Sequence, residues 1–142
     1  MDEIGEIAAF YAARLDEDEA VALKASRKRK PPWRLEGTPG FLSGRVSSSP
    51  EGASPSALDR SAVADVITGV VGAHVARHDP GRALREVEAG RAEIARWRFL
   101  AAEYERTRHG ADMMRRDELA TVLRRRAAVW DDHANYREAW AL

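Results

Sequence analysis

Two histidines four residues apart form the first candidate functional site of this sequence. His74 and His78 would share one face of a helix, so both could bind one metal ion. A third ligand could come from His133 in the C-terminal tail. The metalloprotease signature requires a glutamate directly after the first histidine, and this sequence has Val75 there. A divalent metal at the three histidines is therefore one hypothesis. The interpretation that we favour is that His74 and His78 bond the tail or a backbone carbonyl where two helices meet.

A run of basic side chains around a tryptophan is the second candidate site. Basic residues that flank an aromatic ring can bind phosphates and stack a base, and such binding weakens steeply with salt. The alternative that we favour is a solvated helix end that matches the acidic run of a neighbour. Contact of these residues with nucleic acid or with an acidic partner is therefore a hypothesis. We call this run the basic segment, and its members are Lys24, Arg27, Lys28, Arg29, Lys30, Trp33 and Arg34.

Catalytic motifs are missing from the sequence. It has no glycine-rich phosphate loop of the G-x-x-x-x-G-K type and no visible arrangement of nucleophile, base and orienting group. We therefore expect a protein that is not an enzyme and that has no cofactor other than the hypothetical metal.

Length and composition set the class of protein. The chain has 142 residues, which is typical of one domain, and it has no cysteine, which excludes disulfides. Its 23 basic and 23 acidic side chains cancel, which argues against a dedicated nucleic-acid binder but leaves room for local patches. The acidic residues 1–6 do not resemble a signal peptide, and no apolar stretch is long enough to span a bilayer. We expect a cytoplasmic protein with no membrane contact.

The first half of the chain is predicted to be a helix followed by a loop-rich insert. Apolar residues at spacings of three and four predict a helix over residues 3–27, which Pro31-Pro32 would stop. Residues 31–56 are rich in Gly, Pro and Ser, and Trp33–Glu36 could pair with residues 41–46 as a short hairpin. Residues 47–56 are predicted to be a mobile linker.

The second half is predicted to be helical, and its firmest boundary lies at Asp79-Pro80. A helix over residues 56–77 should end there. The next helix should begin at Pro80, because Asp is a good N-cap and Pro favours the first helical position. The next helix, 80–108, would be roughly 43 Å long, so it should break near Gly90 or be covered by a second protomer. Gly110 is a plausible C-terminal stop.

The helix after Pro80 carries a nearly heptad apolar stripe. Because few other helices could face the stripe, we predict a self-association face and a homo-oligomer. A last helix should begin near Asp112, and Tyr136 and Trp140 should dock the tail back onto the bundle. The stripe consists of Leu84, Val87, Ile94, Trp97, Ala101 and Tyr104.

Three blocks of sequence carry a family resemblance. They are FYAARLDEDEA at residues 10–20, HVARHDPGRALREVEA at 74–89 and DHANYREAW at 132–140. Through these blocks the chain resembles a family of uncharacterised small proteins from actinobacteria and their phages. The resemblance implies no activity, because that family has no established function.

Together these observations predict a mainly α protein, either a small helical bundle or a long helical hairpin, with a loop-rich insert. We expect one domain over residues 1–142, divided into an N-terminal helix (1–30), the insert (31–56) and a helical core with its docked tail (57–142). The favoured function is a non-enzymatic accessory protein of the phage or actinobacterial type that contacts a protein partner or itself. A nucleic-acid-associated regulator and a histidine-based metal-binding protein stay open as alternatives.

Overall fold

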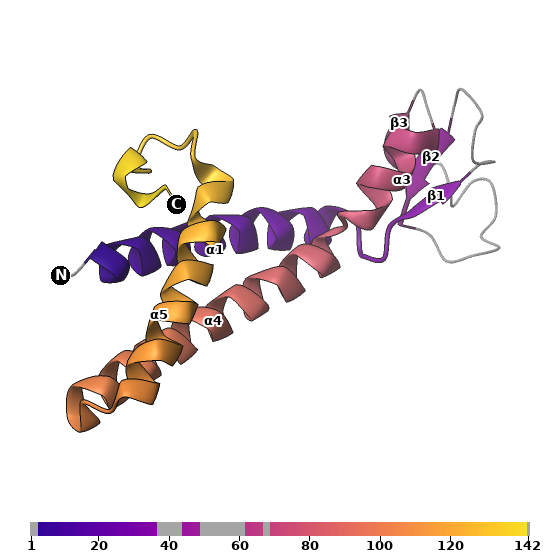
Figure 1. Cartoon of the computed structure of the whole chain (residues 1–142). Coiled ribbons are helices and arrows are strands. Elements are labelled where there is room, and N and C mark those ends of the chain that lie inside the picture. The colour runs from indigo at the N-terminus through magenta and orange to yellow at the C-terminus, as the bar shows by residue number, and fades with distance from the viewer. Residues whose placement is uncertain (1–2, 37–43, 49–61, 67–68, 142) are drawn as a thin grey trace. The chain divides into compact units, whose positions relative to one another are not determined.

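The chain is mainly α-helical, as predicted. The computed structural model describes residues 3–36, 44–48, 62–66 and 69–141 (Figure 1). Within these residues the elements are the helices α1 (Glu3–Lys28), α3 (Gly69–Arg77), α4 (Pro80–Thr107) and α5 (Gly110–Ala127), the strands β1 (Arg34–Glu36), β2 (Gly44–Ser47) and β3 (Ala62–Val66), and the short 3-10 turns η1 (Ala128–Trp130) and η2 (Glu138–Trp140). None of the described helices is long and apolar enough to cross a membrane.

The fold consists of two compact units. Unit 1 combines Met1–Glu17 with Val87–Leu142, and unit 2 is Asp18–Glu86. The long helices α1 and α4 each contribute residues to both units. We predicted one domain over residues 1–142 and did not predict these two units.

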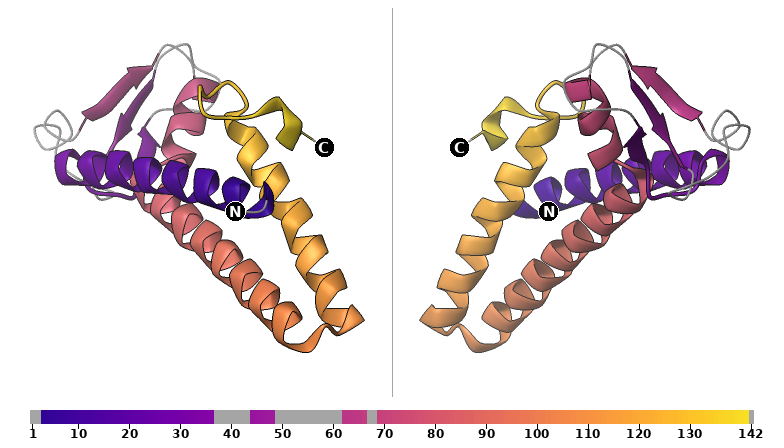
Figure 2. Two further views of the ribbon diagram at one scale, coloured as in Figure 1. Left: turned by 90° about the vertical axis from the view of Figure 1, so that its left-hand side faces the viewer. Right: turned by 90° about the vertical axis from the view of Figure 1, so that its right-hand side faces the viewer.

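Unit 1 is a helical bundle with a single apolar core. Within it, α4 and α5 run antiparallel and are joined by a short turn (Figure 2), and the first turns of α1 complete the core. Each large apolar side chain buried in this way contributes about 1.5–3 kcal/mol. The core residues are Ile7, Ala8, Phe10, Tyr11, Leu15, Val87, Ile94, Trp97, Ala120, Leu123, Ala127 and Trp140.

Helix α4 runs unbroken through Gly90, so the break that we considered there is absent. Gly90 is buried, and a Cβ atom at this position would lie against the Tyr11 hydroxyl and 2.8 Å from Leu15 Cδ1. The missing side chain therefore lets the backbone of α4 come close to α1.

The C-terminal tail docks onto the core, as predicted. Trp140 is only 4% exposed, and its ring lies 5.3 Å from the Phe10 ring of α1. Tyr136 packs edge-on against both rings, at 5.9 Å from Phe10 and 5.6 Å from Trp140. These three aromatic side chains fix the end of the chain to the start of α1.

Unit 2 contains a three-stranded antiparallel sheet in the order β1-β2-β3. The predicted hairpin is present, since Leu35 of β1 pairs with Val46 of β2, and Val46 is fully buried. The first residues of the predicted partner, 41–43, lie outside the described residues. So do residues 49–56 of the predicted linker, whereas Ser47 belongs to β2.

The predicted helix over residues 56–77 is wrong over residues 62–66, which form β3, while residues 56–61 lie outside the described residues. This strand pairs with β2, with Ala64 opposite Val46. Val63 and Val66 are β-branched and suit a strand as well as a buried helix face, so local pattern alone could not separate the two. Helix α3 begins only at Gly69.

The helix boundaries after residue 77 are partly as predicted. Asp79 caps α4: its Oδ1 accepts a hydrogen bond from the backbone N–H of Arg82 at 2.7 Å. Gly110 is not the stop of α4, as we predicted, but the first residue of α5. Arg108 takes the left-handed conformation instead (φ 52°), and its N–H donates to the carbonyl of Tyr104 at 2.8 Å, which is an αL cap. The last helix, predicted to begin near Asp112, begins two residues earlier, with His109 as its N-cap.

Candidate interaction sites

The three histidines of the predicted metal site lie in different units. His74 on α3 and His78 in the turn after it belong to unit 2, and their rings are 4.4 Å apart. Both are exposed. His133 belongs to unit 1, where its Nε2 lies against the guanidinium of Arg14. Among the described residues no three His, Asp or Glu side chains gather as metal ligands, and the three-histidine site stays a prediction.

The basic segment lies within unit 2, at the end of α1 and the start of β1. Lys24, Arg27 and Lys28 are exposed on α1. Trp33 is half-buried, and its Nε1–H donates to the carbonyl of Arg29 at 3.1 Å. The indole of Trp33 is thus bonded to the backbone just after the end of α1, and the contact of the other members with this ring stays a prediction.

The predicted self-association stripe is largely covered within the chain. Val87, Ile94 and Trp97 belong to the core of unit 1, and Ala101 packs against that core. Tyr104 is half-buried, with the guanidinium of Arg116 over its ring at 4.6 Å. The core of unit 1 already accounts for most of this apolar pattern. Homo-oligomerisation through the stripe stays a prediction.

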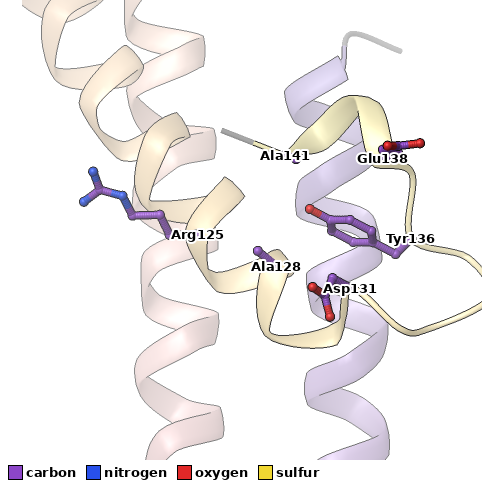
Figure 3. A pocket seen from close by; sticks show the side chains of 6 residues that line it. All are labelled: Arg125, Ala128, Asp131, Tyr136, Glu138 and Ala141. Atoms are coloured by element: carbon purple, nitrogen blue, oxygen red, sulfur yellow. The ribbon is translucent and has the colours of Figure 1, made fainter.

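A pocket between the end of α5 and the tail is a site that our sequence analysis missed. It has a volume of about 610 Å³, and we call it the tail pocket. In the view of Figure 3, the Tyr136 ring reaches from the tail toward the end of α5, with Asp131 below it, while the guanidinium of Arg125 points away from the ring. The lining residues are Arg125, Ala128, Asp131, Tyr136, Glu138 and Ala141.

The backbone of the tail holds the pocket walls in place. The N–H of Tyr136 donates to the carbonyl of His133 at 2.8 Å, and the N–H of Ala141 donates to the carbonyl of Glu138 at 3.0 Å. Arg137, between them, forms an ion pair of 2.6 Å with Glu6 of α1. Together with the aromatic contacts of Tyr136, these bonds shape the pocket before any ligand arrives.

The charged side chains of the tail pocket face solvent without an ion-pair partner in the described part of the chain. Asp131, Glu138 and Arg125 are all exposed, and none of them forms an ion pair within the described part of the chain. Unit 1 carries fifteen acidic against twelve basic side chains, a net charge of −3. The lining of the tail pocket therefore combines an aromatic ring with two carboxylates and one guanidinium, in a unit of net charge −3.

The chain is similar to a known protein family over almost its whole length. The profile of a family of unknown function, DUF6221, matches residues 4–142. The chain belongs to DUF6221. No curated protein and no solved structure matches it. The match to DUF6221 spans residues of both units.

This DUF6221 chain has a second, smaller hollow between α4 and α5. Its volume is about 320 Å³, and its apolar lining is Leu100, Leu119 and Val122. Further along α4, Arg106 donates a hydrogen bond to Glu103 at 2.7 Å, which lowers the pKa of the Glu103 carboxyl. That carboxyl is engaged within its own helix.

A buried arginine contacts the tail of the DUF6221 chain. The side chain of Arg14 is 7% exposed, pairs with Glu17 at 2.8 Å and lies over the Phe10 ring at 5.2 Å. Its Nε has no hydrogen-bond partner. Arg14 therefore links α1 to His133 of the tail, with one donor left unsatisfied.

Proposed function

We propose that this DUF6221 protein is a non-enzymatic interaction protein that binds a basic segment of a partner protein in its tail pocket. The observation that carries the proposal is that Tyr136, Asp131 and Glu138 line the same pocket, and that the two carboxylates have no ion-pair partner in the described part of the chain. In biological terms we propose an accessory factor of actinobacteria or of their phages, on the strength of the three resembling blocks.

The chemistry of the tail pocket selects for a cation. A lysine or arginine side chain can lie over the face of a tyrosine ring while its charged end meets a carboxylate. The net charge of −3 on unit 1 adds a long-range attraction for basic segments and a repulsion for acidic ones.

The rigidity of the pocket favours affinity. Tyr136 is already held by Phe10, Trp140 and the backbone bond to His133, so little further ordering is needed when a ligand binds. Binding to a preorganised wall loses less conformational entropy than binding to a mobile one.

The test is the affinity of the full chain for a fluorescein-labelled octapeptide of alternating Arg and Ala, measured by anisotropy. The double variant Asp131→Asn, Glu138→Gln removes both carboxylates. Exposed charge contacts are each worth up to about 1 kcal/mol, so we expect the double variant to bind roughly 5- to 30-fold more weakly.

The matched control is the double variant Glu88→Gln, Glu118→Gln. These two acids are also exposed, unpaired and part of unit 1, so the net charge changes equally. Affinity within about twofold of the unchanged chain supports the tail pocket, whereas an equal loss in both variants contradicts it. Equally tight binding of an octapeptide with Glu in place of Arg also contradicts it.

A further inference from the structure

The lysines of this chain are confined to one place. The sequence has only three, Lys24, Lys28 and Lys30, and all belong to the basic segment. Lys24, Arg27 and Lys28 follow a spacing of three and four, which puts them on one face of α1, and all three are exposed. The end of α1 therefore presents a compact cationic surface.

Four of these cations have no carboxylate partner in the part of the chain that the structure describes. In unit 1, nine of the twelve arginines pair with a carboxylate within 4 Å. In contrast, no described acid pairs with Lys24, Arg27, Lys28 or Lys30. Among the described residues, most arginines of unit 1 are therefore paired, whereas these four cations of unit 2 are not.

The net charge of zero conceals a separation of charge between the units. Unit 2 has eleven basic against eight acidic side chains, a net of +3, which balances the −3 of unit 1. The overall balance that argued against a nucleic-acid binder is therefore a sum of two opposite values. Unit 2 taken alone has the sign of charge that a polyanion requires.

The aromatic side chain among these cations is held in a fixed position. The backbone N–H of Trp33 donates to Asp79 Oδ2 at 3.4 Å, and its Nε1–H donates to the carbonyl of Arg29. The indole is only half-buried, so part of the ring faces solvent. A fixed ring next to phosphate-binding cations is the arrangement on which a base can stack.

We propose that unit 2 binds single-stranded nucleic acid through the basic segment, with Lys24, Arg27, Lys28 and Lys30 on phosphates and Trp33 against a base. This activity is independent of the tail pocket, which lies in the other unit. Four phosphate contacts on a single strand correspond to a slope of about −2.8 for log affinity against log salt.

The experiment measures the anisotropy of a labelled thymidine oligonucleotide of about 20 nucleotides with the full chain. Between about 50 and 200 mM salt, the affinity should fall roughly 50-fold. The triple variant Lys24→Gln, Arg27→Gln, Lys28→Gln should lose more than about 10-fold at the lower salt, and its slope should approach −0.7.

The control is the triple variant Arg96→Gln, Arg98→Gln, Arg125→Gln. These arginines of unit 1 are also exposed and have no described carboxylate partner, so the charge change is the same. Circular dichroism and melting confirm that both triple variants fold. Retained binding by the control supports the proposal. It is overturned by equal losses in both variants, by an absence of binding at about 50 mM salt, or by tighter binding of a duplex of the same length.

Discussion

Gly90 of α4 lies directly against Tyr11 of α1, with no room for a Cβ atom between them. The Gly90→Val variant should therefore lower the free energy of unfolding by about 1–3 kcal/mol, because the added methyl groups overpack the core. Gly110 has nothing within 4 Å of its missing Cβ atom, so Gly110→Val is the matched control and should change stability little. Urea unfolding measures both; equal stability of the two variants would show that the helices do not meet at Gly90.

Asp79 joins two segments of unit 2, since it caps α4 and accepts the N–H of Trp33. We expect Asp79→Ala to destabilise the protein by about 1–2 kcal/mol, whereas Asp79→Asn should lose much less because Asn is an equally good N-cap. Thermal melting compares the two variants. An Asn variant as unstable as the Ala variant would mean that capping is not the main role of this side chain.

Trp140 anchors the tail against Phe10. Trp140→Ala should lower the free energy of unfolding by about 3–5 kcal/mol, or release the tail, because it empties a buried aromatic site. Limited proteolysis distinguishes the two results, because only a released tail is cleaved after residue 130. The variant should also lose the octapeptide binding of the tail pocket, since Tyr136 would no longer be held. Retained peptide affinity with a cleavable tail would contradict the role of the docked tail.

Arg14 is buried with an unsatisfied Nε, so its charge is not expected to stabilise the fold. We expect Arg14→Met to lie within about 1 kcal/mol of the unchanged chain or to be more stable, because an apolar side chain of similar length needs no desolvation of a charge. Arg14→Ala should lose about 2 kcal/mol or more through the emptied space. A large loss in the Met variant would show that the contacts with Glu17 and His133 outweigh desolvation.

The helical elements could be predicted because their signals are local. The limits of α1 follow from its apolar spacing and from Pro31, and the start of α4 follows from the Asp79-Pro80 pair. The docking of Trp140 followed from the improbability of leaving a large aromatic side chain in water.

The remaining features depend on contacts between distant residues. Strand β3 exists because it pairs with β2, and no local pattern distinguished Val63 from a residue of a buried helix. The αL cap at Arg108 was missed because glycine is the usual residue there, and Gly110 was close by. The tail pocket could not be predicted, since the turns after Trp130 bring Asp131 and Glu138 to the same cavity.

The most direct test of the proposed function is a titration of the ¹⁵N-labelled full chain with the Arg-Ala octapeptide, followed by two-dimensional NMR. Binding in the tail pocket predicts the largest amide shift changes at Ala128, Tyr136 and Ala141, with little change around Trp33 of unit 2. Saturable shifts centred on any other part of the chain, or no saturable shifts in a protein that remains folded, would contradict the proposal.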